Sequence, residues 1–182
     1  DQLTDPDMLR NEVTRMLQDD RAASLAEDFA GQQFGFAGFL QHSAPDPERF
    51  PAFTPELRAS MYEEVVRFHR HIFEGEAPLT DLIAADYSFL NAELARHYDL
   101  DVNLSRNEWQ RVSLDSERGG GLLGMGLFLT KNSEPLRTSP VLRGTWILES
   151  VLGRELSNPP ANIPAISQDE SDVAGRSVAE QL

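Results

Sequence analysis

Hydrophobic residues recur at helical spacing along most of this chain. The clearest stripe has separations of three and four residues and consists of Leu57, Met61, Val65, Phe68 and Ile72. Such spacing places all five side chains on one face of a helix. Thr54 precedes Pro55 as an N-cap, and Gly75 follows the stripe. The pattern therefore predicts one long amphipathic helix between Thr54 and Gly75.

Weaker patterns predict the other elements. Asp5-Pro6 is typical of a helix start, and Ser139-Pro140 begins a late helix that Gly153 ends. In that late helix the expected buried stripe is Val141, Thr145, Leu148 and Leu152, with Trp146 beside it. The predicted helices cover residues 6–17, 22–40, 79–85, 86 or 88 to 98, 121–130 and 140–152, and a short strand covers 109–114.

Together these patterns predict an all-α fold, mainly helical with at most one short strand pair, arranged as an irregular helical bundle. Pro159, Pro160 and Pro164 predict an extended, Pro-rich C-terminal tail. We expect a helical module over residues 1–107, a second module over 108–166 packed on it, and an acidic linker or tail over 167–182.

The net charge of the sequence limits the classes of molecule that the protein can bind. The 182 residues include 30 Asp and Glu against 16 Lys and Arg, which gives a formal net charge of -14. Such a surface repels phosphate backbones, so we predict no nucleic-acid binding. It suits a basic protein partner, or keeps the protein soluble.

The chain contains no cysteine. This excludes disulfides, thiolate metal sites and haem attachment through Cys-x-x-Cys-His within these residues. No apolar run approaches the roughly 18 residues of a membrane span, so no transmembrane segment is predicted. Because the sequence starts at Asp1 without methionine, we expect a processed form or a fragment.

A dense motif of glycine, proline, arginine and tryptophan occupies residues 118–153. Its members are Arg118, Gly119, Gly120, Arg137, Thr138, Ser139, Pro140, Arg143, Gly144 and Trp146. The glycines before a helix could bind an anion, but a tight turn that lets the last two helices pack closely is favoured. We interpret the arginines as clamps on carboxylates or carbonyls, with ligand binding as the alternative.

The candidate reactive side chains do not indicate a metal site or a particular reaction. The four histidines are His42, His69, His71 and His97. His69 and His71 lie on different helix faces, so surface or capping roles are favoured and no metal site is predicted. Asp115 and Glu117 could act as acid and base, although an ion pair with a nearby arginine is favoured. We predict no catalytic residue, and the sequence favours a protein without enzymatic activity.

Two ordered groups of motifs carry a resemblance. The first spans about residues 3–101 and includes Phe29-Ala30-Gly31-Gln32, Asp46-Pro47-Glu48-Arg49-Phe50-Pro51 and Leu94-Ala95-Arg96-His97-Tyr98. The second spans about 110–166 and includes Arg118-Gly119-Gly120, Arg137-Thr138-Ser139-Pro140-Val141, Arg143-Gly144 and Trp146-Ile147-Leu148-Glu149. In these segments the chain resembles the planctomycete-type cytochrome c-associated proteins, an exported family of unknown function.

The chain also departs from that family. Family members usually continue into a Cys-x-x-Cys-His haem site after a segment like Ser177 to Leu182, where this chain stops. The resemblance therefore implies no cofactor in this chain, and a possible haem c in a longer parent protein. Met125 or a histidine is an alternative axial ligand to a neighbouring haem, with a packing role favoured for the methionine.

The resemblance implies a non-catalytic scaffold or interaction module of an exported cytochrome c-associated protein that serves electron transfer. The expected location is periplasmic or extracellular, and the expected partners are other protein subunits or a cytochrome domain. One alternative is a structural subunit of a larger membrane or electron-transport complex. Another is an extracellular polymer-acting enzyme domain, for which Trp109, Asp115 and Glu117 form the first candidate site.

Overall fold

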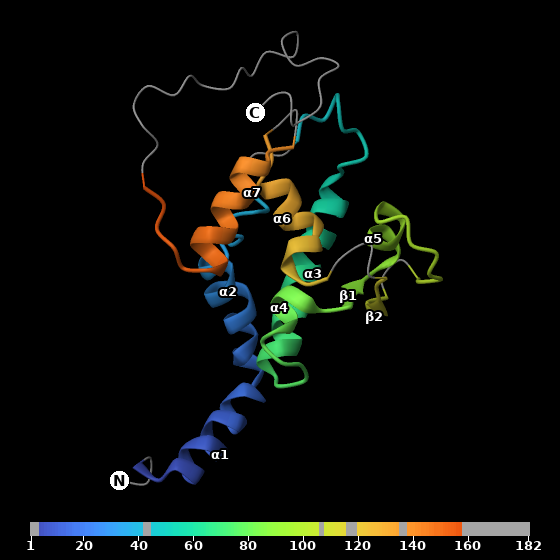
Figure 1. Cartoon of the computed structure of the whole chain (residues 1–182). Helices are drawn as coiled ribbons and strands as arrows, with labels where there is room; N and C mark the ends of the chain where they lie inside the picture. Colours follow the sequence, from blue (N-terminus) through green and yellow to red (C-terminus); the bar gives the residue numbers. More distant parts are fainter. Residues whose placement is uncertain (1–3, 42–44, 106–107, 116–119, 135–137, 158–182) are drawn as a thin grey trace.

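A computed structural model describes residues 4–41, 45–105, 108–115, 120–134 and 138–157 (Figure 1). The α-helices are α1 (Pro6–Leu17), α2 (Ala30–Gln33), α3 (Pro55–Phe73), α4 (Asp81–Ala84), α5 (Ala92–His97), α6 (Gly126–Lys131) and α7 (Pro140–Trp146). The strands are β1 (Tyr87–Leu90) and β2 (Gln110–Ser113). Short 3-10 turns cover Asp20–Ala22 and Leu122–Gly124, and π turns cover Leu25–Phe29 and Ile147–Val151. The prediction of a mainly helical fold with one strand pair is confirmed.

Helix α3 is the element on which the others pack. The Thr54 hydroxyl accepts the Leu57 N–H at 3.1 Å, and Gly75 follows the helix with a φ of 85°. Its predicted apolar stripe is buried throughout. Strand β1, helices α5 and α6 and the Leu25–Phe29 turn all contact α3. The long helix predicted from periodicity is therefore confirmed, and it forms the centre of the core.

Strands β1 and β2 pair antiparallel, with Tyr87 opposite Ser113 and Leu90 opposite Gln110. The strand predicted over residues 109–114 is confirmed. The helix predicted from residue 86 or 88 is wrong in its first part, because residues 87–90 are strand and α5 begins only after the Asn91 cap. Pairing with a strand about twenty residues later overrides the local pattern.

The helix predicted over residues 22–40 ends early. Its regular part finishes at Gln33, and Gly35 turns the chain with a φ of 71°. The Gly31 carbonyl then accepts the Phe36 and Ala37 N–H groups at 2.7 and 3.0 Å. A Cβ on Gly31 would lie 3.2 Å from the Ala37 Cβ, so glycine permits this close return of the chain.

The last helix begins and ends where predicted, but its buried face differs. Val141 and Leu152 are more than half exposed, whereas Trp146 is only 6% exposed. Trp146 stacks on Phe128 with ring centroids 4.6 Å apart and donates its indole N–H to the Phe34 carbonyl at 2.9 Å. The π turn after Trp146 widens the helical repeat, so the expected stripe does not stay on one face.

One hydrophobic cluster joins both parts of the sequence. From the first part it includes Phe36, Met61 and Phe68; from the second it includes Leu127, Phe128 and Trp146. The predicted module boundaries themselves stay a prediction. The predicted tail lies outside the described residues.

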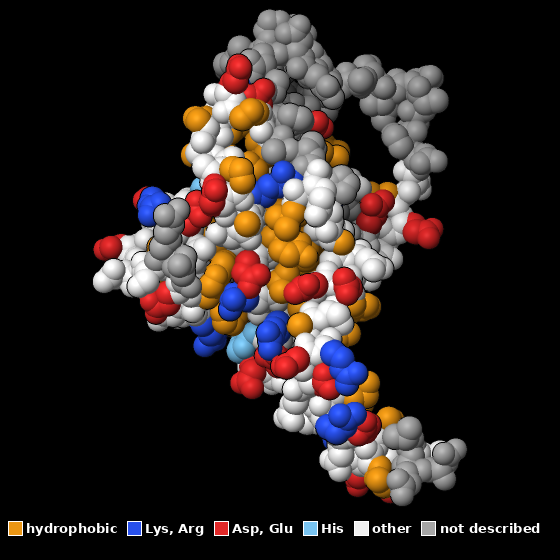
Figure 2. Space-filling model, turned by 180° about the vertical axis from the view of Figure 1, so that it is seen from behind, with side chains coloured by type: hydrophobic (Ala, Val, Ile, Leu, Met, Phe, Trp, Pro, Cys, Tyr) orange, Lys and Arg blue, Asp and Glu red, His pale blue; other side chains and the backbone are white. Residues whose placement is uncertain are grey.

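Helix α1 stands apart from this core. Figure 1 shows it extending away from the body formed by the other helices, and no residue of α1 is buried. Asp5 caps the helix by accepting the Asp7 N–H at 2.9 Å. In Figure 2 hydrophobic side chains lie at the surface of this helix beside charged ones. No helix within the described ranges has both the length and the apolar character needed to cross a bilayer.

Candidate functional site

A cleft of about 900 Å³ opens between α3, the end of α5, α6, α7 and the loop that follows α2. That volume lies within the range of small-molecule sites in proteins. Its apolar lining comes mainly from Phe39, Phe50, Phe53, Met61 and Leu129. Its polar lining includes Arg49, His97, Tyr98, Lys131, Ser133, Glu134, Thr138 and Arg143.

Tyr98 joins the cleft to a buried carboxyl group. Glu64, on α3, is only 1% exposed. Its Oε2 accepts the Tyr98 hydroxyl at 2.6 Å, and its Oε1 accepts the Ser88 hydroxyl at 2.6 Å. Because both oxygens accept hydrogen bonds, the carboxyl group is held in one orientation.

The Tyr98 hydroxyl also accepts the Gly126 N–H at 2.8 Å. This N–H lies in the first turn of α6, where no helical carbonyl can accept it. A side chain at Gly126 would place its Cβ 2.9 Å from the Tyr98 oxygen and 2.8 Å from the Met61 Cε. Glycine therefore allows α6 to begin directly against the Glu64–Tyr98 pair.

Two cations lie in the cleft without a carboxylate partner in the described part of the chain. Arg143 donates through Nη2 to the Leu129 carbonyl at 3.4 Å and to the Ser133 hydroxyl at 3.3 Å. Its Nε is buried and has no acceptor there. Among the described residues, the ammonium group of Lys131 has neither a hydrogen-bond partner nor an ion-pair partner, and desolvation lowers its pKa. The residue as a whole stays exposed, so only its enclosed end is affected.

The structure separates the members of the predicted motif. Thr138 and Arg143 line the cleft, and Ser139 caps α7 by accepting the Leu142 N–H. Pro140 is the first residue of that helix, Trp146 is buried in the core, and Gly144 has open space beside it. Arg143 donates to the Leu129 carbonyl, and its role as a clamp stays a prediction. Arg118, Gly119 and Arg137 lie outside the described residues.

Gly120 and Gly121 pack against α4 and the residue that follows it, and not between the last two helices. A Cβ on Gly120 would lie 1.1 Å from the Ala85 carbonyl oxygen. Gly121 has a φ of 63°, and its Cβ would lie 2.4 Å from the Leu82 carbonyl oxygen. The expected tight turn is thus present, but the backbone it approaches belongs to residues 82–85.

His69 corrects the assignment of the histidines to surface or capping positions. It is fully buried among aromatic rings that include Phe34, Phe36 and Phe73. Burial lowers its pKa to about 4, and the bond from its Nδ1–H to the Val65 carbonyl opposes this only in part. His97 is exposed in the cleft, and His42 lies outside the described residues. Within the described ranges no three His, Asp or Glu residues are grouped as a metal site.

The residues suggested for polymer chemistry are not gathered in the cleft. The Trp109 ring is covered by the Arg67 guanidinium at 4.9 Å from its centroid. Asp115 is exposed and does not line the cleft, and Glu117 lies outside the described residues. Sequence reasoning missed Glu64, Tyr98 and Lys131 as site residues. The signal was available, since Glu64 lies three residues after Met61 and four before Phe68 and so falls on the buried stripe of α3.

Comparison with known proteins identifies the two parts of the chain. Residues 1–100 match the family PSD4, a protein of unknown function (DUF1592), and residues 118–182 match PSCyt3, a protein of unknown function (DUF1588). Both are planctomycete cytochrome-associated domains of unknown function. No curated protein and no solved structure matches the chain significantly. Because the first match covers more than half of the sequence, the chain belongs to the PSD4 family of cytochrome-associated proteins, with a PSCyt3 module after it.

Proposed function

We propose that this chain is a non-catalytic interaction module of an exported cytochrome c-associated protein, and that α1 docks on an apolar surface of a cytochrome domain that serves electron transfer. A periplasmic or extracellular location, and a haem c carried elsewhere in a longer parent protein, belong to the same proposal. The observation that carries it is the exposed apolar face of α1.

That face, here called the α1 stripe, consists of Met8, Leu9, Val13 and Met16, which are 46–57% exposed. Helices of about twelve residues are marginal in water without tertiary packing. The Asp5 cap and the Arg15–Glu12 ion pair support α1 locally, but they leave its apolar face in water. Covering what is still exposed would contribute roughly 4 kcal/mol, or about a thousandfold in affinity.

Charge indicates what kind of surface would cover the stripe. The chain carries a formal net charge of -14. A partner with basic groups around an apolar patch would be attracted at long range and then held by burial of the stripe. The combination of an apolar stripe and a negative net charge favours binding to a specific protein partner over non-specific hydrophobic association.

A matched pair of variants tests the proposal. Leu9→Asp with Val13→Asp places two charges on the α1 stripe, whereas Asn11→Asp with Thr14→Asp places two charges on the opposite, exposed face. Neither pair touches the core, so melting curves should stay unchanged. We expect binding to a c-type cytochrome domain from the same organism, measured by biolayer interferometry, to weaken at least about tenfold for the stripe variant only.

Equal binding by the two variants would refute the docking role of α1. Sedimentation of the chain alone over a range of concentrations provides a second check. If the wild type dimerises and the stripe variant does not, the stripe joins two copies of this chain and the proposed cytochrome partner is wrong.

The alternative functions have weaker support. A polymer-acting enzyme needs convergent carboxylates, and Glu134 is the one carboxylate among the described residues that line the cleft. The alternative of a structural subunit held by its acidic tail depends on residues 167–182, which the structure does not describe.

A further inference from the structure

The charge of the cleft is opposite to that of the protein. The chain as a whole has 30 acidic and 16 basic side chains, yet the described lining of the cleft contains Arg49, Lys131 and Arg143 against Glu134 alone. In a protein with a net charge of -14, this local excess of positive charge requires a reason beyond composition. A cleft lined by one sign of charge concentrates ligands of the opposite sign.

Arg143 is fixed in place without being neutralised. Its hydrogen bonds go to the Leu129 carbonyl and the Ser133 hydroxyl, both of which are neutral acceptors. Its Nε–H is buried without an acceptor among the described residues. Arg143 as a whole is half-buried. A charged ligand in the cleft would supply the anionic partner that a partly desolvated guanidinium group normally has.

Lys131 is the only lysine in the sequence. It comes from the last turn of α6, and its Nζ would lie 3.3 Å from a Cβ on Gly35. Glycine at that position therefore leaves room for the ammonium group. No described carboxylate lies close enough to pair with it, and its pKa is lowered by desolvation alone. An anion in the cleft would offset that desolvation.

The rest of the lining is apolar. Phe39, Phe50, Phe53, Met61 and Leu129 supply most of the carbon surface, and Phe50 remains 40% exposed. A ligand that only carried charge would leave this surface in water. The lining is typical of small-molecule sites, in which apolar walls supply affinity and a few polar groups fix orientation.

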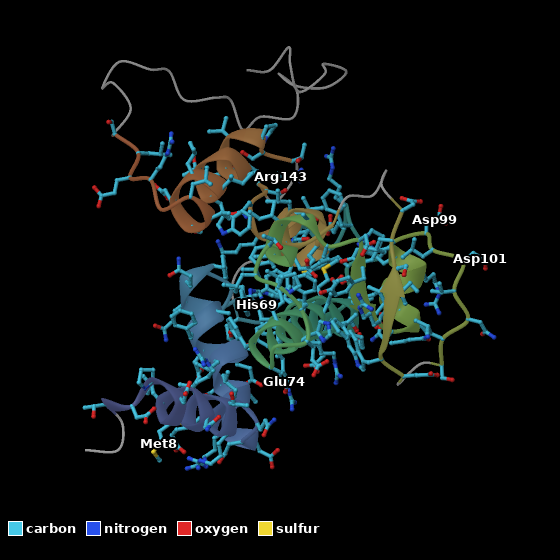
Figure 3. All side chains as sticks on the ribbon, turned by 60° about the horizontal axis from the view of Figure 1, so that its bottom comes forward. Met8, His69, Glu74, Asp99, Asp101 and Arg143 are labelled. Carbon is cyan, nitrogen blue, oxygen red and sulfur yellow. The ribbon has the colours of Figure 1, made fainter. Side chains whose placement is uncertain are left out.

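From these observations we infer that the cleft binds a small organic carboxylate with an aromatic or aliphatic body, whose charged group is held by Lys131 and Arg143 and whose body lies against the phenylalanine walls. This site is separate from the α1 stripe. Figure 3 places Arg143 and Met8 at opposite ends of the molecule, in agreement with Figure 1.

The test uses two carboxylates and their uncharged counterparts. Phenylacetate, octanoate, phenylacetamide and octanamide are titrated into the full chain by calorimetry. We expect saturable binding of at least one acid, with its amide binding at least about tenfold more weakly because the charge-assisted hydrogen bonds are lost. Isotope-labelled reductive methylation of the single lysine then gives one side-chain signal, which should shift on titration with the acid.

Lys131→Met is the informative variant, because the Lys131 side chain has no hydrogen bond or ion pair among the described residues and methionine keeps most of its aliphatic length. It should weaken binding of the acid about tenfold, whereas Arg10→Met, on exposed α1, should leave it unchanged. The inference is overturned if neither acid binds saturably, if acid and amide bind equally, or if Lys131→Met binds like the wild type. Stripe variants of α1 should bind the acid normally, so failure here is distinct from failure of the docking proposal.

Discussion

Tyr98→Phe is expected to be one of the most destabilising single-atom deletions in this protein. The Tyr98 hydroxyl donates to the buried Glu64 carboxyl group at 2.6 Å and accepts the Gly126 N–H at 2.8 Å. Phenylalanine fills the same space but can make neither bond. The Glu64 carboxyl group and the Gly126 N–H, which both belong to buried residues, would then each lose a partner.

The magnitude follows from the two bonds. Loss of a hydrogen bond to an acidic group costs about 1.5–3 kcal/mol, and leaving a buried N–H without an acceptor costs about 1–3 kcal/mol. Because one hydroxyl serves both partners and the site can partly relax, we expect a total of about 3 kcal/mol. For a chain of this size that corresponds to a fall of roughly 6–12 °C in Tm.

The measurement is urea unfolding of the full chain, followed by circular dichroism. Tyr62→Phe is a matched control, since the Tyr62 ring packs against Phe36 and its hydroxyl has no hydrogen bond in the described part of the chain. That control should change the free energy of unfolding by less than about 0.5 kcal/mol. If Tyr98→Phe were no worse than Tyr62→Phe, the buried network would not contribute to stability.

Adding Glu64→Gln to Tyr98→Phe measures how far the charge of Glu64 strengthens its interaction with Tyr98. The double variant should be less destabilised than the sum of the single variants by about 1–2 kcal/mol. Strict additivity would mean that the 2.6 Å contact carries no coupling energy.

Two further predictions concern His69 and the glycine motif. With a folded pKa of about 4 against about 6.5 unfolded, His69 binds a proton more readily in the unfolded state, so its contribution is complete above about pH 6.5 and is lost as pH falls towards 4. The shifted pKa of His69 should therefore lower the free energy of unfolding by about 2 kcal/mol as the pH falls from about 7 to 5. In urea titrations at several pH values, His69→Leu should remove this part of the pH dependence. An unchanged pH dependence would contradict the burial of His69 as a neutral group. Gly120→Ala should lower the free energy of unfolding by more than about 3 kcal/mol, because its Cβ would lie 1.1 Å from the Ala85 carbonyl oxygen. Gly144→Ala lies in a helix with open space beside it and should raise the free energy of unfolding by about 0.5–1 kcal/mol. Thermal melts measure both effects. Equal effects of the two alanines would refute the close approach at Gly120.

Much of the fold could be predicted where the signal is local. The caps at Asp5, Thr54 and Ser139, and the stop at Gly153, mark helix ends correctly because capping involves neighbours within three residues. Strand β1 could not be predicted in the same way. Its residues alternate weakly, and they become a strand only through pairing with β2.

The candidate site likewise contains residues that local sequence signals identify and residues that only the tertiary structure reveals. Arg143 was identified as a residue that fixes the loop, since an arginine in a motif rich in glycine and proline suggests a clamp. Lys131 was not identified, because nothing in its neighbourhood along the chain shows that a cleft encloses its end. The burial of His69 also depends on rings contributed by the segment after α2, which a helical wheel does not contain.

The shared core has a consequence for how this protein can evolve. Phe36 and Met61 belong to the PSD4 match, Leu127 and Trp146 belong to the PSCyt3 match, and all four lie in one hydrophobic cluster. A gene that lost either segment would leave the other with an uncovered apolar surface, which promotes aggregation. We therefore expect the two segments to be inherited together as one unit.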